Sequence, residues 1–278
     1  VDGLFEELER SGFPRLDVTC EGRPRIVGSG RATGRGIGHV VCRLFCTSDQ
    51  QKKQDGRQTK GRKHGAKIPP APPESTPLGW RNYLDPISIP EGDTRTPHTT
   101  SDGSMTLHSD RFGQTYHSRH GALTESRHVF LEAGWSHRMA GLEELSGLSD
   151  RSIRVLELGL GTGLNALLTR KAHGDWTRAD LPSLVYEALE PHPLQPAEWG
   201  AMALPTWSGV EGDADLHAHP DAEQHEVVWS DDARFVRHRT TWQQFAQDRS
   251  RRGNYDLIYF DAFAPDSQPE LWYNRGSN

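Results

Sequence analysis

The fold of this chain is decided by a stretch in which a strand runs into a glycine-rich turn and then into a helix: Ile153-Arg154-Val155-Leu156-Glu157-Leu158-Gly159-Leu160-Gly161-Thr162-Gly163-Leu164-Asn165. Glycine has no Cβ, so the three glycines allow a tight turn and a close approach of the backbone to a ligand. NAD-binding proteins share this kind of turn, and it also occurs without any ligand. The stretch therefore predicts a strand–turn–helix unit of an α/β fold and a candidate ligand-binding loop.

Two side chains beside the turn favour S-adenosylmethionine as the ligand. Glu157 lies two positions before the first glycine, where a carboxylate can organise the loop around a cationic methionine end. Asn165 adds a polar side chain at the start of the following helix. The predicted cofactor-binding residues of this loop are Glu157, Gly159, Gly161, Gly163 and Asn165.

A further carboxylate, Glu190, follows the strand expected over residues 183–189. At the carboxyl end of this strand, an acidic residue can accept hydrogen bonds from the ribose hydroxyls of a nucleotide. Glu187 is the alternative, but it lies inside the expected strand. A strand-end carboxylate can also simply face water. We assign the predicted ribose contact to Glu190.

The strand expected over residues 255–261 ends in the most distinctive motif of the chain, Asp261-Ala262-Phe263-Ala264-Pro265. Ligands of α/β folds bind at the carboxyl edge of the sheet, so the motif places a carboxylate and an aromatic ring there. Asp261 can hold or deprotonate an ammonium group, and Phe263 can stack on a base. The alternative is a core phenylalanine with Asp261 capping a helix. Asp261 and Phe263 are the predicted catalytic residues.

Alternating strands and helices surround these motifs, which is typical of a parallel sheet. Upstream, two β-prone runs within residues 105–117 predict a hairpin, and a helix is expected over residues 122–133 with Gly134 as its C-cap. Residues 206–225 are acidic and predict a loop in which the histidines face water. Further elements are expected at residues 164–172, 195–204 and 242–249 as helices and at 227–229 and 235–238 as strands.

From residue 102 to residue 272 the sequence resembles the methyltransferase family that completes 5-methylaminomethyl-2-thiouridine in tRNA, which occurs alone or as the N-terminal half of the bifunctional MnmC proteins. The hairpin–helix preface and the motif after Asp261 are specific to this family, whereas many methyltransferases share the glycine-rich loop. The motifs that carry the resemblance are Phe112-Gly113-Gln114-Thr115-Tyr116, Thr124-Glu125-Ser126-Arg127-His128-Val129-Phe130-Leu131, Glu157 to Asn165, Glu190-Pro191-His192-Pro193-Leu194 and Asp261 to Pro265.

The resemblance implies a Rossmann-like class I methyltransferase sheet with S-adenosyl-L-methionine as cofactor. It implies that the glycine loop and Glu190 bind this cofactor, and that Asp261 and Phe263 act on an aminomethyluridine at the tRNA wobble position. Thr241 lies where relatives often have a Gly-Asp pair near the adenine, and Asp231-Asp232 is the alternative. The implied partners are tRNA and an oxidoreductase of the same pathway, either fused or separate.

The charge distribution keeps a second enzymatic function open. Residues 1–73 contain 14 basic and 8 acidic residues, and the remainder contains 18 basic and 30 acidic residues. RNA-binding proteins usually carry a basic surface, whereas an acidic one suits a small free amine. A methyl- or aminopropyltransferase for such an amine is therefore one alternative. A non-enzymatic alternative is an incomplete gene product that keeps a partial cofactor fold and turns nothing over.

The two ends of the chain carry separate expectations. Residues 1–97 include a polar run at 50–67 and a proline-rich linker at 69–73, so we expect disorder or a spurious extension there. The methyltransferase domain is then expected over residues 98–278. Since only 17 residues follow Asp261, we expect a sheet truncated at its C-terminus, with one edge of the 255–261 strand unpaired.

Composition adds expectations about location and metals. No run approaches the roughly 18 apolar residues that a membrane span needs, and the start lacks the features of a signal peptide. Three cysteines make no disulfide framework in a chain of 278 residues. We therefore expect a cytoplasmic protein. Cys20, His39, Cys42 and Cys46 lack paired C-x-x-C spacing, so no metal site is predicted.

Overall fold

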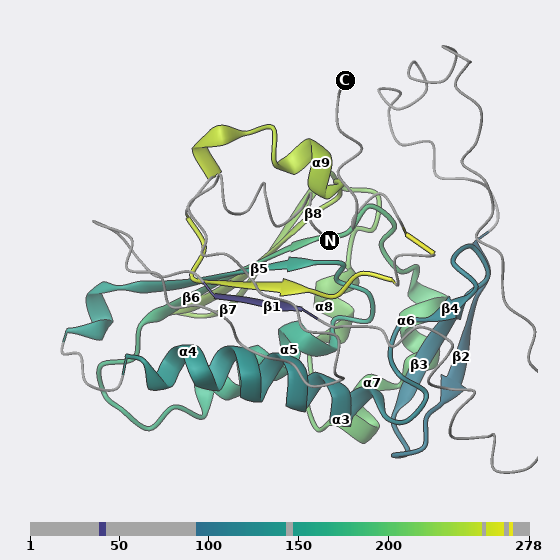
Figure 1. The fold of residues 1–278 in the computed structure, drawn as a ribbon, viewed down its shortest axis with the longest axis horizontal. Helices are drawn as coiled ribbons and strands as arrows, with labels where there is room; N and C mark the ends of the chain where they lie inside the picture. The colour runs from purple at the N-terminus through teal and green to yellow at the C-terminus, as the bar shows by residue number, and fades with distance from the viewer. Residues whose placement is uncertain (1–38, 43–92, 143–146, 252–253, 264–266, 269–278) are drawn as a thin grey trace, which may run out of the picture. The chain divides into compact units, whose positions relative to one another are not determined.

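The computed structural model describes residues 39–42, 93–142, 147–251, 254–263 and 267–268. They all fall in one of two compact units, which comprises Val1–Phe45 and Gly92–Asn278. Its main element is a six-stranded sheet in the order β1-β9-β5-β6-β8-β7 (Figure 1). These strands are β1 (His39–Cys42), β9 (Leu257–Phe260), β5 (Ser152–Leu158), β6 (Ser183–Leu189), β8 (Ala233–His238) and β7 (Gln224–Ser230).

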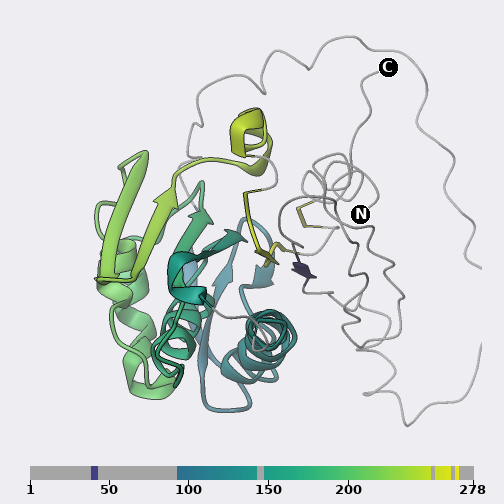
Figure 2. The same cartoon turned by 90° about the vertical axis from the view of Figure 1, so that its left-hand side faces the viewer.

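Neighbouring strands of this sheet are parallel, except for the antiparallel pair β7 and β8. All four residues of β9 are buried, as expected for a central strand covered on both faces. In β7, by contrast, exposed residues alternate with half-buried ones, and Val228 is 75% exposed. Figure 2 shows this pair at one edge of the sheet and β1, in purple, at the other. The predicted α/β class with a largely parallel sheet, as in Rossmann-like folds, is confirmed.

One face of the sheet is covered by α5 (Leu164–Gly174) and by a long helix made of α3 (Ala122–Ser126), the π-helical segment η2 (Arg127–Ser136) and α4 (His137–Ala140) (Figure 1). Phe130 and Trp135 of η2 are buried in the same core cluster as Tyr259 of β9. The long helix continues through Gly134. The prediction that this glycine ends a helix is therefore wrong, because packing of the apolar face onto the sheet carries the helix past it.

The other helices within the described residues are short. They are η3 (Leu148–Asp150), α6 (Pro196–Met202), α7 (Leu204–Ser208), α8 (Asp213–His217), α9 (Trp242–Phe245) and η4 (Arg249–Arg251). Residues 206–225, expected to form a loop, thus contain α8 and part of α7. None of the helices among the described residues is long and apolar enough to cross a membrane.

A second sheet precedes the first in the chain and contains β2 (Arg95–Thr99), β3 (Met105–Ser109) and β4 (Gln114–Thr115), all antiparallel. The β3–β4 pair confirms the predicted hairpin. Asp102, in the β2–β3 turn, accepts hydrogen bonds from the backbone nitrogen and the hydroxyl of Thr124 in α3. These bonds hold the small sheet against the long helix.

The structure corrects two expectations about the ends of the fold. The edge of β9 that was expected to be unpaired carries β1, in parallel register from His39 opposite Leu257 to Cys42 opposite Phe260. Strand β2 begins at Arg95, so it crosses the boundary placed after residue 97. The rest of the range expected to be disordered, residues 1–38 and 43–92, lies outside the described residues, as does the end of the chain from residue 269.

Candidate active site

The carboxyl ends of the central strands lie in register, and this brings the predicted site residues together. Leu158 pairs with Leu189 of β6 on one side and with Phe260 of β9 on the other. The next residues in the three segments are Gly159, Glu190 and Asp261. A glycine loop, an acidic residue and the distinctive motif therefore meet at one edge of the sheet, the edge at which α/β folds bind ligands.

The glycine loop needs its glycines for conformation and for space. Gly159, Gly161 and Gly163 have φ values of 90°, 54° and 80°, in the region that side chains with a Cβ rarely adopt. A Cβ on Gly159 would lie 2.7 Å from the backbone oxygen of Asp261. A Cβ on Gly161 would lie 2.9 Å from the ring of Tyr116. The loop therefore fits directly against both the Asp261 motif and the hairpin.

Replacing Gly159 by alanine should destabilise the protein by about 1–3 kcal/mol, because the new Cβ forces an unfavourable φ and displaces the backbone at Asp261. Chemical denaturation measures the effect. The matched control is Gly174→Ala at the end of α5, where a Cβ meets nothing within 4 Å. If both variants unfold at the same denaturant concentration as wild type, the described loop conformation is wrong.

Asn165 connects two acidic residues that are far apart in sequence. Its Nδ2 donates to Glu157 Oε1 and to Asp261 Oδ2, each at 2.9 Å. Glu157 is fully buried, and burial raises the pKa of its carboxyl group well above the ordinary value. Asp261 is half-buried, and its backbone nitrogen donates to Leu158 O at 3.2 Å. The amide thus fixes the Asp261 carboxylate beside the glycine loop.

Glu190 holds the loop from the other side. Its Oε2 accepts from the backbone nitrogen of Gly161 at 3.0 Å, and its Oε1 accepts from that of His192 at 2.8 Å. The residue is only 7% exposed. Each carboxylate oxygen can accept two hydrogen bonds, so acceptor capacity remains beyond these backbone bonds.

Phe263 packs against aromatic rings of the hairpin region. Its ring stacks on Phe112 with a centroid distance of 4.3 Å and an interplanar angle of 23°. Tyr116 meets it edge-on, at 5.1 Å and 76°. Phe263 therefore lies at the predicted edge of the sheet, with Phe112 covering part of its surface.

The two candidate adenine contacts lie at different ends of strand β8. Thr241 is the N-cap of α9, where its hydroxyl accepts from the backbone nitrogen of Gln244 at 3.3 Å. It follows the carboxyl end of β8, so it is on the site's edge of the sheet. Asp231 and Asp232 immediately precede β8, and Asp232 O accepts from Leu184 N near the start of β6. That pair therefore lies at the amino ends of the parallel strands, opposite to the site.

Sequence reasoning missed one histidine that supports the loop. His217 in α8 was expected to face water, but it is fully buried. Burial lowers the pKa of His217 to about 4, so the ring is neutral at pH 7. Its Nε2 lies 3.1 Å from Thr162 O and donates to that carbonyl. Nothing in the polar stretch around it indicates burial.

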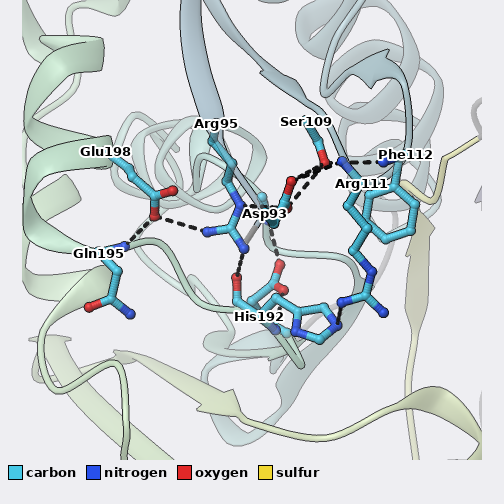
Figure 3. A network of polar contacts seen from close by, with 10 residues as sticks. Asp93, Arg95, Ser109, Arg111, Phe112, His192, Gln195 and Glu198 are labelled. Carbon is cyan, nitrogen blue, oxygen red and sulfur yellow. Dashed lines mark hydrogen bonds and ion pairs between the residues drawn. The ribbon is translucent and has the colours of Figure 1, made fainter. Parts of the chain in front are cut away.

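Arg95 was also missed, because it falls in the range expected to be disordered. Its guanidinium donates to Asp93 at 3.1 Å, to Glu198 at 2.9 Å and to the backbone oxygen of His192 at 3.0 Å. Figure 3 shows this network between the small sheet and the segment that follows β6. Since Glu190 binds the backbone nitrogen of His192, the network leads directly to the glycine loop.

Curated proteins with similar sequences are MnmC proteins. Relatives named "tRNA 5-methylaminomethyl-2-thiouridine biosynthesis bifunctional protein MnmC" are 28% identical over 177 residues in Burkholderia multivorans and 30% identical over 178 residues in Vibrio vulnificus. These matches cover 60% and 59% of this chain. The resemblance to MnmC proteins is confirmed. The chain spans 25% of the length of each of these two relatives.

A third MnmC relative, from Delftia acidovorans, is 29% identical over 213 residues, which is 72% of this chain and 27% of the relative. No family model matches the sequence. Among solved structures, the crystal structure of MNMC2 from Aquifex aeolicus aligns with a TM-score of 0.42 and 21% identity, over 66% of this chain and 54% of that one.

Proposed function

We propose that this protein transfers a methyl group from S-adenosylmethionine to the amine of 5-aminomethyl-2-thiouridine at the wobble position of tRNA, forming 5-methylaminomethyl-2-thiouridine. The observation that carries the proposal is the Asn165 bridge between Glu157 and Asp261, which sets a carboxylate beside the glycine loop. The names of the MnmC relatives support the choice of pathway. The MnmC relatives are bifunctional, which supports a fused or separate oxidoreductase partner. Action on tRNA would place the protein in the cytoplasm.

The residues present fit the proposed cofactor. A cationic ligand favours acidic neighbours, and the loop has Glu157 at its start and Glu190 against its centre. Asn165 Oδ1 is buried and has no hydrogen-bond partner within the described part of the chain. Such an atom can accept from an ammonium group. We propose that these side chains and the three loop glycines hold the methionine end of the cofactor, and that Glu190 accepts from the ribose. Thr241 is proposed to contact the adenine.

When bound, S-adenosylmethionine supplies an electrophilic methyl group. The chain's own residues then prepare the amine that attacks it. Asp261 accepts a proton from the substrate ammonium, so that the nitrogen lone pair is free. Asn165 keeps the Asp261 carboxylate in one orientation, and Phe263 positions the base next to it. Since the reaction is a direct displacement, orientation of the two reactants supplies most of the rate enhancement.

The test of the proposed function is transfer of labelled methyl from S-adenosylmethionine to tRNA that carries 5-aminomethyl-2-thiouridine. Product is expected with this tRNA and not with tRNA that already carries the final methyl. Cofactor binding without any methyl transfer would contradict the proposal. It would favour the alternative that the chain is an incomplete gene product without catalytic activity.

The acidic balance of residues 74–278 favours a second candidate, a methyl- or aminopropyltransferase for a small free amine. An acidic surface attracts a small cation and repels RNA. Incubation with polyamines and labelled S-adenosylmethionine separates the two proposals. Labelled polyamine in the absence of labelled tRNA would support this candidate over the first.

Replacing Glu190 by alanine should weaken S-adenosylmethionine binding by about 1–3 kcal/mol, because the ribose loses a charged acceptor. The loop also loses the acceptor that holds Gly161 N. Calorimetric titration measures the affinity, and Glu226→Ala on the exposed strand β7 is the control. If the Glu190 variant and wild type bind S-adenosylmethionine with equal affinity, Glu190 does not contact the cofactor.

A further inference from the structure

A cation lies at the outer end of the aromatic stack that leads to Asp261. Arg111 and Phe112 lie between strands β3 and β4, and the Arg111 guanidinium is 5.3 Å from the centroid of the Phe112 ring. Phe112 in turn stacks on Phe263 at 4.3 Å. Arg111 is exposed. The arrangement therefore runs from an exposed guanidinium through two rings to the motif that contains the candidate catalytic residue.

Arg111 is fixed in place by a neutral partner. Its Nη1 donates to His192 Nε2 at 2.8 Å (Figure 3). Burial, together with the charges of Arg111 and Arg95, lowers the pKa of His192 to about 4, so the ring accepts this bond at pH 7. Asp93 and Arg239 are the other charged groups that act on His192. The bond orients the guanidinium without neutralising its charge.

The neighbouring Arg95 differs from Arg111 because carboxylates neutralise its charge. Arg95 is paired with Asp93 and Glu198, and its side chain is only 8% exposed. For Arg111, no ion pair with a carboxylate is found among the described residues, and its contact with Asp93 is made by the backbone nitrogen. Of these two arginines, Arg111 is the one that presents an uncompensated charge to solvent near the site.

We propose that Arg111 binds a backbone phosphate of the RNA strand that delivers the target nucleotide to Asp261, while Phe112 supports Phe263 against the target base. The inference rests on the proposed function and adds a phosphate contact to it. Single-stranded RNA is typically bound by cations that contact phosphates beside aromatic rings that stack on bases. Arginine is suited to phosphate because its planar fork donates two parallel hydrogen bonds. A fixed cation here also explains how an otherwise acidic domain holds RNA at this position.

The test is the affinity of Arg111→Met for tRNA that carries 5-aminomethyl-2-thiouridine, measured over a series of salt concentrations. Loss of one phosphate contact should weaken binding roughly tenfold at low salt and reduce the slope of log K against log salt by about one. Arg111→Lys keeps the charge and should retain most of the slope. Arg151→Met is the matched control, since Arg151 is an exposed arginine just before β5 and has no ion pair with a carboxylate among the described residues. It should behave as wild type.

Three outcomes would contradict the inference. If wild type binds tRNA but Arg111→Met shows the same salt slope, Arg111 contacts no phosphate, and the proposed function is unaffected. If Arg111→Met instead weakens binding of S-adenosylmethionine and leaves tRNA binding unchanged, the anion that Arg111 binds is the carboxylate of the cofactor and not an RNA phosphate. If wild type binds no tRNA even at low salt, both this inference and the proposed function are wrong.

Discussion

Replacing Asp261 by asparagine should lower the rate of methyl transfer by about 10²–10⁴-fold, the usual contribution of a positioned proton acceptor. Asparagine has nearly the same shape, and its amide oxygen can still accept from Asn165 Nδ2, which now bonds Asp261 Oδ2 at 2.9 Å. It cannot take a proton from the substrate ammonium. The loss should therefore appear in a single-turnover assay with saturating cofactor and tRNA, while the affinity for S-adenosylmethionine changes by a small factor.

The control for this variant is Asp175→Asn, which changes an exposed carboxylate just after α5. Asp175 pairs with Lys171 at the surface, where an ion pair contributes little to stability. This control should transfer methyl as fast as wild type. Full activity of Asp261→Asn would show that Asp261 is not the proton acceptor. If cofactor affinity and transfer rate fell by the same factor, Asp261 would act in cofactor binding and not in the chemical step.

The sequence predicted the central strands well because each is a largely apolar run bounded by turn residues. Strand β6 has the predicted bounds, Ser183–Leu189, and its carboxyl end places Glu190 beside the glycine loop. The predicted residues of the Asp261 motif and the loop also meet, since parallel strands end at one edge of the sheet. Their specific link was not predictable: Asn165 and Asp261 are 96 positions apart, and a hydrogen bond at that separation leaves no local pattern.

Two further features were missed because they depend on contacts between distant parts of the chain. His217 lies in a polar segment that would face water if it were a loop, but α8 packs its side chain under the glycine loop. Strand β1 is four residues long, too short for a periodic pattern, and it pairs with a strand more than 200 positions later. No local pattern therefore indicated a partner strand at that edge of β9.

Replacing Arg95 by methionine should destabilise the protein by about 3–5 kcal/mol, the usual cost of removing one partner from a buried ion pair. The side chains of Arg95, Asp93 and Glu198 are 8%, 13% and 18% exposed, so both carboxylates would lose their cation with little access to water. Thermal unfolding should show a midpoint lower by roughly 10 °C. Lys171→Met removes an exposed ion pair of the same kind and should shift the midpoint by at most about 2 °C.

The same variant tests whether the small sheet supports the site. Arg95 holds the backbone oxygen of His192, and Glu190 holds its backbone nitrogen together with that of Gly161. Without Arg95, the segment after β6 should become more mobile, and the glycine loop with it. Binding of S-adenosylmethionine should therefore weaken at temperatures at which the variant is still folded, and Arg95→Lys should recover part of the affinity because it restores the charge. If Arg95→Met unfolds early but binds the cofactor as tightly as wild type below its transition, Arg95 stabilises the fold without positioning the loop.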